Sequence, residues 1–187
     1  MALQQAVPSA ARVISDVSPR DDQVSIGPVL PEDMGALFVW LNDADTATSD
    51  MTYRPIDAIA FKGWLEEQTK QQLLFSMRLL QPPRLAGFVI FKNLQPVIRA
   101  ADIGVRVGVE ADRGRGYGTR ATRLALDYAW RTLNLHRVSL TVFADNPRAI
   151  AAYARAGFQQ EGVMRAAGFT AGTWRDVVIM AAINPAG

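Results

Sequence analysis

The period of the hydrophobic pattern changes within residues 101–131, and this change is the most informative feature of the chain. From Ile103 to Val109, apolar residues alternate with glycine or arginine, which predicts a strand with one buried side. From Ala121 to Arg131, apolar residues recur at helical spacing, with charged residues on the opposite face. Between the two segments lies the sequence Arg113-Gly-Arg-Gly-Tyr-Gly-Thr119. Its glycines permit positive φ and leave backbone amides uncovered at a helix N-terminus, so the unit predicts a site for an anion, which we expect to be a phosphate.

The remaining pattern predicts one domain over residues 23–187 after a flexible leader at 1–22. Before the central unit it indicates a strand at 24–30, a helix opened by Pro31, a helix at 56–71, and a hairpin of strands at 73–80 and 85–94. After the central unit it indicates a strand at 138–142, a helix between Asn146 and Gly157, and strands at 158–165 and 174–183. The last strand is a nearly continuous apolar run, as expected for a strand buried on both faces.

Composition excludes several classes of protein. The 187 residues include no cysteine and one histidine, so we expect no disulfide, no cysteine nucleophile and no metal site. We find no signal-peptide pattern and no apolar run of membrane-spanning length, and a cytoplasmic protein without membrane contact is the expectation. Four arginines (Arg113, Arg115, Arg120 and Arg123) cluster around the glycines, although the net charge is only +2. No aromatic series accompanies them, which favours a small phosphate ligand over nucleic acid.

Two common phosphate motifs fit the loop poorly. The P-loop sequence of nucleoside triphosphatases is absent. The dinucleotide fingerprint survives only as Gly116-x-Gly118-x-x-Ala121, and His136 stands where an acidic ribose partner is expected.

Arg113-x-x-Gly116-x-Gly118 instead resembles the pyrophosphate loop of the GNAT superfamily of N-acetyltransferases. A second motif, Asn146-x-x-Ala149-x-x-x-Tyr153-x-x-x-Gly157-Phe158, is more specific. Together with 133–137, 161–162 and 174–176, it looks like the RimJ/RimL-type branch. The resemblance implies an α/β fold (α+β by some schemes) with a central mixed, mostly antiparallel, splayed sheet flanked by helices. It also implies acetyl-CoA as the acetyl donor.

The resemblance also assigns roles to individual residues. Tyr153 would be the general acid for the departing thiolate, and Glu161 the general base, with Asp102 and Glu110 as weaker candidates. The cofactor-binding residues would be Val107, Gly108, Val109, Arg113, Gly114, Arg115, Gly116, Tyr117, Gly118, Thr119 and Asn146. Trp40, Asn42, Asp43 and Trp174 are candidates for the acceptor side. We expect direct attack by the amine in a ternary complex, because the chain lacks the cysteine that most often carries an acyl group.

The acceptor stays open at this point. A protein N-terminal α-amine, a polyamine such as spermidine, and an antibiotic or amino-sugar amine are all compatible with the sequence. Two other classes are a CoA-binding regulator without turnover and a nucleic-acid-binding module. A homodimer is also left open.

Overall fold

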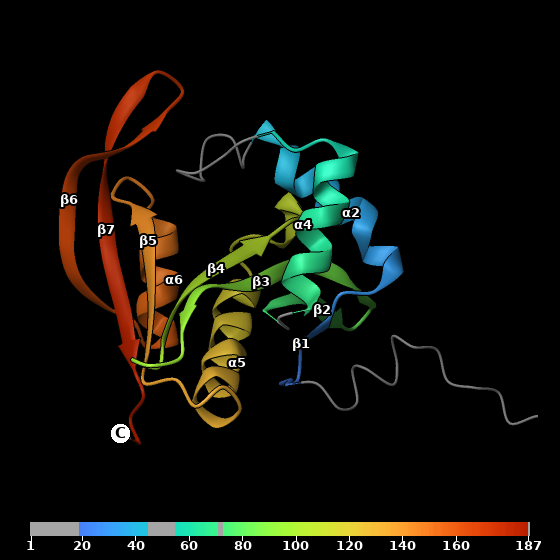
Figure 1. The fold of residues 1–187 in the computed structure, drawn as a ribbon, viewed down its shortest axis with the longest axis horizontal. Coiled ribbons are helices and arrows are strands. Elements are labelled where there is room, and N and C mark those ends of the chain that lie inside the picture. Colours follow the sequence, from blue (N-terminus) through green and yellow to red (C-terminus); the bar gives the residue numbers. More distant parts are fainter. Residues whose placement is uncertain (1–18, 45–54, 71–72, 187) are drawn as a thin grey trace, which may run out of the picture.

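The computed structural model describes residues 19–44, 55–70 and 73–186, which form one seven-stranded sheet with helices on both faces (Figure 1). Its strands are β1 (Val24–Pro28), β2 (Leu74–Leu80), β3 (Pro83–Gln95), β4 (Ala100–Val107), β5 (Arg137–Phe143), β6 (Gln159–Thr170) and β7 (Thr173–Ile183). Its helices are α2 (Met34–Asn42), α4 (Ala58–Lys70), α5 (Tyr117–Arg131) and α6 (Pro147–Ala156), with 3-10 turns at Pro31–Asp33 and Glu110–Asp112. This element order is the predicted one.

The sheet runs in the order β1-β2-β3-β4-β5-β7-β6, and every neighbouring pair is antiparallel except β4 with β5. β4 and β5 pair in parallel only at their starts, where residues 100–102 face residues 137–139. Beyond these residues the two strands separate (Figure 1). The predicted mixed, splayed sheet is therefore confirmed. β7 lies between β5 and β6, and its neighbouring residues Val177 and Val178, which face opposite ways, are both buried, in agreement with its continuous apolar run.

Each face of the sheet carries its own apolar core. On one face, the stripe of α5 (Ala121, Ala125, Ala129) packs against residues of all the inner strands. On the other face, Leu37 of α2 and Phe61 of α4 pack against β2 and β3. Neighbouring residues of β3, such as Val89 and Ile90, belong to different cores, so β3 is buried on both faces. The helical stripes predicted from the sequence are the faces that meet the sheet.

A buried polar cluster fixes the start of α2 to the sheet. Asp33 is 3% exposed and accepts hydrogen bonds from the Leu30 amide (2.8 Å) and the Ser76 hydroxyl (2.6 Å). It also forms an ion pair with Arg78 of β2, whose guanidinium donates to the Pro28 carbonyl (3.3 Å). Because charges are expensive to bury unless they are paired, this network holds α2, β1 and β2 in one arrangement.

The structure moves two predicted boundaries. Arg20 forms a bridge with Ser25, and Asp21 and Asp22 pair with Arg120 of α5, so residues 20–22 contact the domain; residues 1–18 of the predicted leader lie outside the described residues. β6 extends five residues past the predicted 158–165, to a two-residue turn in which Ala171 and Gly172 both have positive φ. Such a turn matches the twist of a long hairpin. None of the helices described is long and apolar enough to span a membrane.

Candidate functional site

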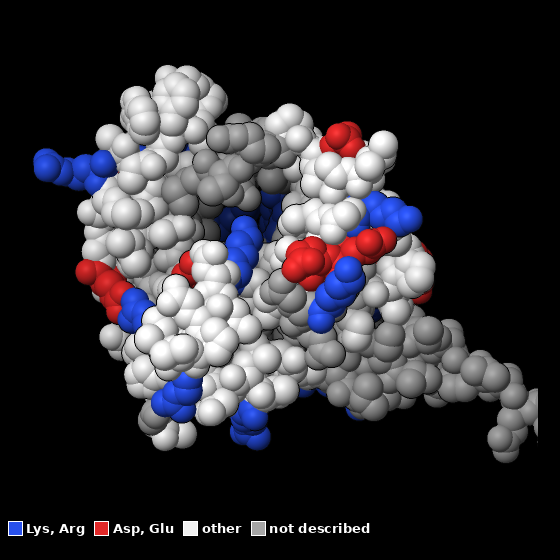
Figure 2. All heavy atoms as spheres, in the orientation of Figure 1, with Lys and Arg blue, Asp and Glu red and all other residues white. Residues whose placement is uncertain are grey.

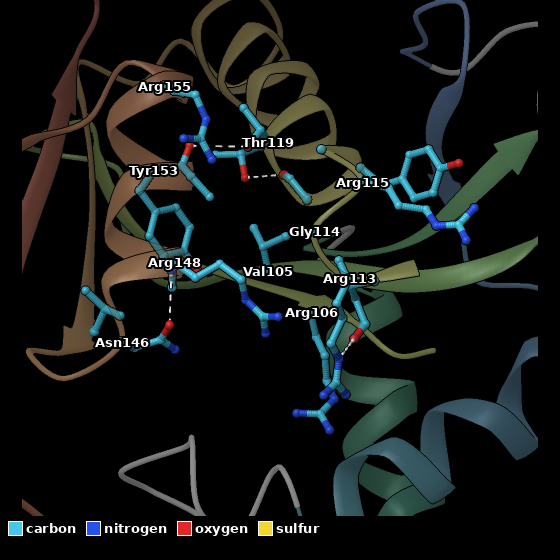
Figure 3. Close-up of a pocket in the computed structure, with 18 of the residues that line it drawn as sticks. Val105, Arg106, Arg113, Gly114, Arg115, Thr119, Asn146, Arg148, Tyr153 and Arg155 are labelled. Atoms are coloured by element: carbon cyan, nitrogen blue, oxygen red, sulfur yellow. Dashed lines mark hydrogen bonds between the residues drawn. The ribbon is translucent and has the colours of Figure 1, made fainter. Parts of the chain in front are cut away.

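A cleft of about 730 Å³ lies where β4 and β5 separate. Its walls come from β4 (Val105, Arg106, Val107), the loop 112–116, the first turns of α5, the end of β5 (Thr141, Val142, Phe143) and one face of α6. Figure 3 shows the side chains of these elements converging on one space. Since β4 has no strand partner on the β5 side after Asp102 within the described residues, its backbone there can pair with a ligand.

The glycine loop has the geometry of an anion site. Gly114 and Gly116 have φ of 80° and 85°, which only glycine adopts readily, and Gly116 is the N-cap of α5. A Cβ on Gly118 would lie 3.4 Å from the Val107 side chain, so this glycine lets α5 start close to β4. The first amides of a helix have no intrahelical acceptor, and the helix dipole is positive there. The loop therefore presents amides and positive potential to the cleft.

Asp112, directly before the loop, is held by a two-pronged ion pair. Both of its oxygens accept from Arg84 of β3, each at 2.6 Å, and the residue is 2% exposed. The hydrogen bonds from Arg84 hold the pKa of Asp112 below its usual value. A carboxylate held in this way is a weak base, and its function here is to fix the turn that presents the glycines.

α6 supplies a tyrosine and an asparagine to the opposite wall. Tyr153 reaches the cleft and packs edge-on against Phe158 (5.9 Å between ring centroids), and its hydroxyl has no hydrogen-bond partner among the described residues. Burial raises the pKa of Tyr153 to about 12, so its hydroxyl stays a donor at any working pH. The Asn146 side chain caps α6 by accepting from the Ala149 amide (3.1 Å) while still lining the cleft.

Arg106 approaches the cleft from the other face of the sheet. Alternate residues of β4 face opposite ways: Val105 and Val107 pack with the α5 core, whereas a Cβ on Gly108 would lie 2.1 Å from the Trp40 indole of α2. Arg106 shares the Gly108 face, and its Nη2 donates to both oxygens of Asp43 at 2.6 Å. The cleft thus passes through the sheet, with the glycine loop on one side and Arg106 on the other.

Most of the predicted site residues meet in the cleft. Those that line it are Val107, Arg113, Gly114, Arg115, Gly116, Tyr117, Gly118, Thr119, Asn146 and Tyr153. Two of the predicted cofactor-binding residues do not: Gly108 is covered by Trp40, and Val109 follows the end of β4 and caps the next 3-10 turn. Asp43 does not line the cleft but accepts hydrogen bonds from Arg106, which does. Trp174 is exposed on the β6–β7 hairpin, where it packs on Phe169.

The structure does not bring the predicted base to the cleft. Glu161 lies on β6, is exposed, and forms an ion pair with Arg137 through both oxygens. Hydrogen bonding from Arg137 lowers the pKa of Glu161. Asp102 lies where β4 and β5 still pair, accepting from Ser139 (2.6 Å) and Asn93 (2.8 Å), and Glu110 is exposed beside the loop. Neither of these two carboxylates lines the cleft.

The arginine cluster predicted around the glycines divides in the fold. Arg113 and Arg115 line the cleft, whereas Arg120 pairs with Asp21 and Arg123 donates to the Arg155 carbonyl. Sequence reasoning missed Arg106, Arg148 and Arg155 as cleft residues. The spacing of residues 148, 152 and 155 along α6, with Asn146 and Tyr153 close by, could have indicated this face.

The described lining therefore contains five arginines (Arg106, Arg113, Arg115, Arg148 and Arg155) and one carboxylate, Asp112, which Arg84 already neutralises. Figure 2 shows basic side chains inside the hollow between the two halves of the molecule. Arginine is the residue best suited to phosphate and carboxylate groups, so the cleft is built for anions.

Residues 23–159 match the family described as acetyltransferase (GNAT) domain. The chain is 35% identical over 95 residues to the spermidine N(1)-acetyltransferase of Escherichia coli (strain K12), covering 51% of this chain and 50% of the relative. It is 29% identical over 126 residues to the ribosomal protein uS5-alanine N-acetyltransferase of the same strain, covering 66% of this chain and 64% of that relative. The chain thus spans only half to two thirds of the length of these relatives.

A similar fold is seen in the crystal structure of spermidine N-acetyltransferase from Vibrio cholerae in complex with CoA and spermine. The TM-score is 0.79 at 22% identity, covering 87% of this chain and 96% of that chain. At this identity the likeness shows the fold alone.

Proposed function

The chain belongs to the GNAT acetyltransferase family, and from this premise we propose that it transfers the acetyl group of acetyl-CoA to an amine. The cleft supports this proposal because its parts match the parts of the donor. The amides around Gly116 and Gly118 and the neighbouring arginines would hold the pyrophosphate. The unpaired backbone of β4 at 105–107 would pair with the amide-rich arm, and Asn146 would add a contact to that arm.

The reaction needs a donor for the thioester oxygen and a proton for the departing sulfur. An amide of the open β4 edge would stabilise charge on the oxygen as the amine attacks. Tyr153 would serve as the acid and donate to the sulfur as the carbon–sulfur bond breaks. The acetyl group would pass directly to the amine, since the sequence contains no cysteine to carry it.

For the acceptor we propose an α-amine, such as a protein N-terminus, in line with the RimJ/RimL-type motifs. The observation that carries this choice is that the described lining offers a polycation no unpaired carboxylate, because its one carboxylate, Asp112, is already held by Arg84. An α-amine also needs less help from a base. Its pKa is about 8, against about 10.4 for an alkyl amine, so at neutral pH a far larger fraction is already unprotonated.

The second candidate is a polyamine acetyltransferase, favoured by the likeness to two spermidine acetyltransferases. A direct comparison of acceptors tests the choice: thiol release from acetyl-CoA is followed at pH 7.5 with a peptide bearing a free N-terminus, the same peptide N-acetylated, and spermidine. We expect the free peptide to exceed spermidine by at least roughly tenfold in kcat/KM. A preference for spermidine would contradict the α-amine assignment.

A CoA-binding regulator without turnover would bind acetyl-CoA in calorimetry yet release no thiol with any amine. A nucleic-acid-binding module would bind with a steep dependence on salt. Glu161 as the base, a cytoplasmic location and a homodimer stay predictions from the sequence, and the first loses support because Arg137 already engages this carboxylate.

A further inference from the structure

We propose that the acceptor carries a carboxylate close to its amine and that Arg106 binds this carboxylate. This proposal rests on the proposed function and narrows its acceptor to acidic α-amines: an amino acid with its free α-carboxylate, or a peptide with an acidic residue next to its N-terminus.

The first observation is the position of Arg106. It lines the cleft from the face of the sheet that holds α2 and α4, whereas the glycine loop, α5 and α6 lie on the other face. Four of the lining arginines belong to that loop or to α6, the elements that would face the phosphates of the donor. Arg106 comes from β4 itself, with Arg113 beside it, at the face of the sheet where a second substrate would enter (Figure 3).

The second observation is the incomplete bonding of its guanidinium. Both hydrogen bonds to Asp43 come from Nη2. Nε is buried without a partner, and no acceptor for Nη1 is found in the described parts of the chain. A guanidinium has five N–H donors, and a buried donor without an acceptor calls for a functional explanation. A carboxylate at the end of the guanidinium would accept from Nη1 and from the second hydrogen of Nη2, a planar two-donor edge that arginine favours.

The third observation is the charge around Arg106. The Nε of Arg113 donates to the carbonyl of Val107, the next residue of β4, which brings a second positive charge close to Arg106 (3.3 Å from Nε to the oxygen). The Arg106 side chain is only 14% exposed, so water screens it weakly. Asp43 balances one charge and holds Arg106 in place, which makes Asp43 a positioning residue here.

The test uses three peptides identical except at the second residue, which is aspartate, asparagine or lysine, together with free aspartate as a second carboxylate source. With wild-type protein we expect kcat/KM to be roughly 10- to 100-fold higher for the aspartate peptide than for the asparagine peptide, mainly through KM, and lowest for the lysine peptide. Turnover of free aspartate above that of its α-amide, which lacks only the α-carboxylate, would identify the α-carboxylate as the bound group.

Two variants separate recognition from folding. Arg106→Gln should reduce the ratio of kcat/KM between the aspartate and asparagine peptides to about 1, whatever its effect on the absolute rates. Asp43→Asn breaks the same ion pair but keeps the guanidinium, and should retain a preference for acidic acceptors. Equal losses for all peptides in both variants would assign the pair a purely structural role and overturn the proposal.

A binding measurement keeps the proposal distinct from the proposed function. Calorimetry with the aspartate peptide and CoA-saturated protein should show binding that Arg106→Gln weakens by the same 10- to 100-fold. Binding that depends on Arg106 without any turnover would refute the proposed acetyl transfer but not the role of Arg106. Turnover without a preference for acidic acceptors would refute the role of Arg106 alone.

Discussion

Replacement of Tyr153 by phenylalanine tests the chemistry of the cleft most directly. The change removes one hydroxyl that has no hydrogen-bond partner among the described residues, and it keeps the ring that packs on Phe158. Stability should therefore change by less than about 0.5 kcal/mol. The glycine loop is untouched, so the affinity for CoA should stay the same.

The expected loss of rate follows from the pKa of this hydroxyl. Burial raises the pKa of Tyr153 to about 12, whereas a thiol has a pKa of about 8.5. The gap of about 3.5 units makes complete proton transfer to a free thiolate unfavourable by about 4.8 kcal/mol. Tyr153 then acts mainly through a hydrogen bond that strengthens as charge builds on the sulfur, worth about 1.5–3 kcal/mol. This range corresponds to roughly a 10- to 150-fold fall in kcat.

Thiol release from acetyl-CoA at saturating acceptor measures kcat, and calorimetry measures CoA affinity. Tyr128→Phe is the matched control, because Tyr128 is a partly buried tyrosine of α5 that packs on Phe75 (5.0 Å between centroids) outside the cleft. It should leave kcat unchanged. An unaltered kcat in Tyr153→Phe would refute the assignment of the acid, and a parallel loss of CoA affinity would show that the tyrosine acts in binding instead.

Three further predictions concern the scaffold. Gly116→Ala should raise KM for acetyl-CoA and lower the free energy of unfolding, measured by urea titration, by about 1–2 kcal/mol. The reason is the φ of 85° at this position, since no described atom lies within 4 Å of the new Cβ. An unchanged KM would argue against the loop as the phosphate site. Asp33→Ala should lower the free energy of unfolding by about 3–5 kcal/mol, because it leaves the guanidinium of Arg78 buried without its carboxylate; a loss under about 1 kcal/mol would contradict this. Because Arg84 lowers the pKa of Asp112, the ion pair stabilises the fold fully above pH 3.8, the usual pKa of this group, and this stabilisation is lost as the pH falls through the lowered pKa. Asp112→Asn should therefore show a smaller drop in melting temperature than wild type on acidification below pH 3.8.

The element order was predictable because each segment has a clear period and a clear end. The alternation of Val138, Leu140 and Val142 and the Asn146-Pro147 cap depend on local rules, and both are present in the structure. The glycine loop was predictable for the same reason, since positive φ is a property of single residues.

The partners of charged residues were not predictable from the sequence. Glu161 precedes a glycine in a motif, but its partner Arg137 lies on β5, and their approach depends on the position of β7 between β5 and β6. The sequence pattern places Arg106 on the face of the strand that we expect to meet solvent. Only the packing of α2 on that face shows that it enters the cleft.

β4 and β5 are joined by three residue pairs, and the cleft opens where the two strands separate beyond these pairs. The part of β4 from Asp102 to Val107 is about 17 Å long. A rotation of β4 by about 5° at Asp102 would therefore shift Val107 by about 1.5 Å. A displacement of about 1 Å can cost an enzyme roughly a hundredfold in rate. The hydrogen bond between Ser139 and Asp102 (2.6 Å) lies at this junction, so we expect Ser139→Ala to change the rate of acetyl transfer although neither residue lines the cleft.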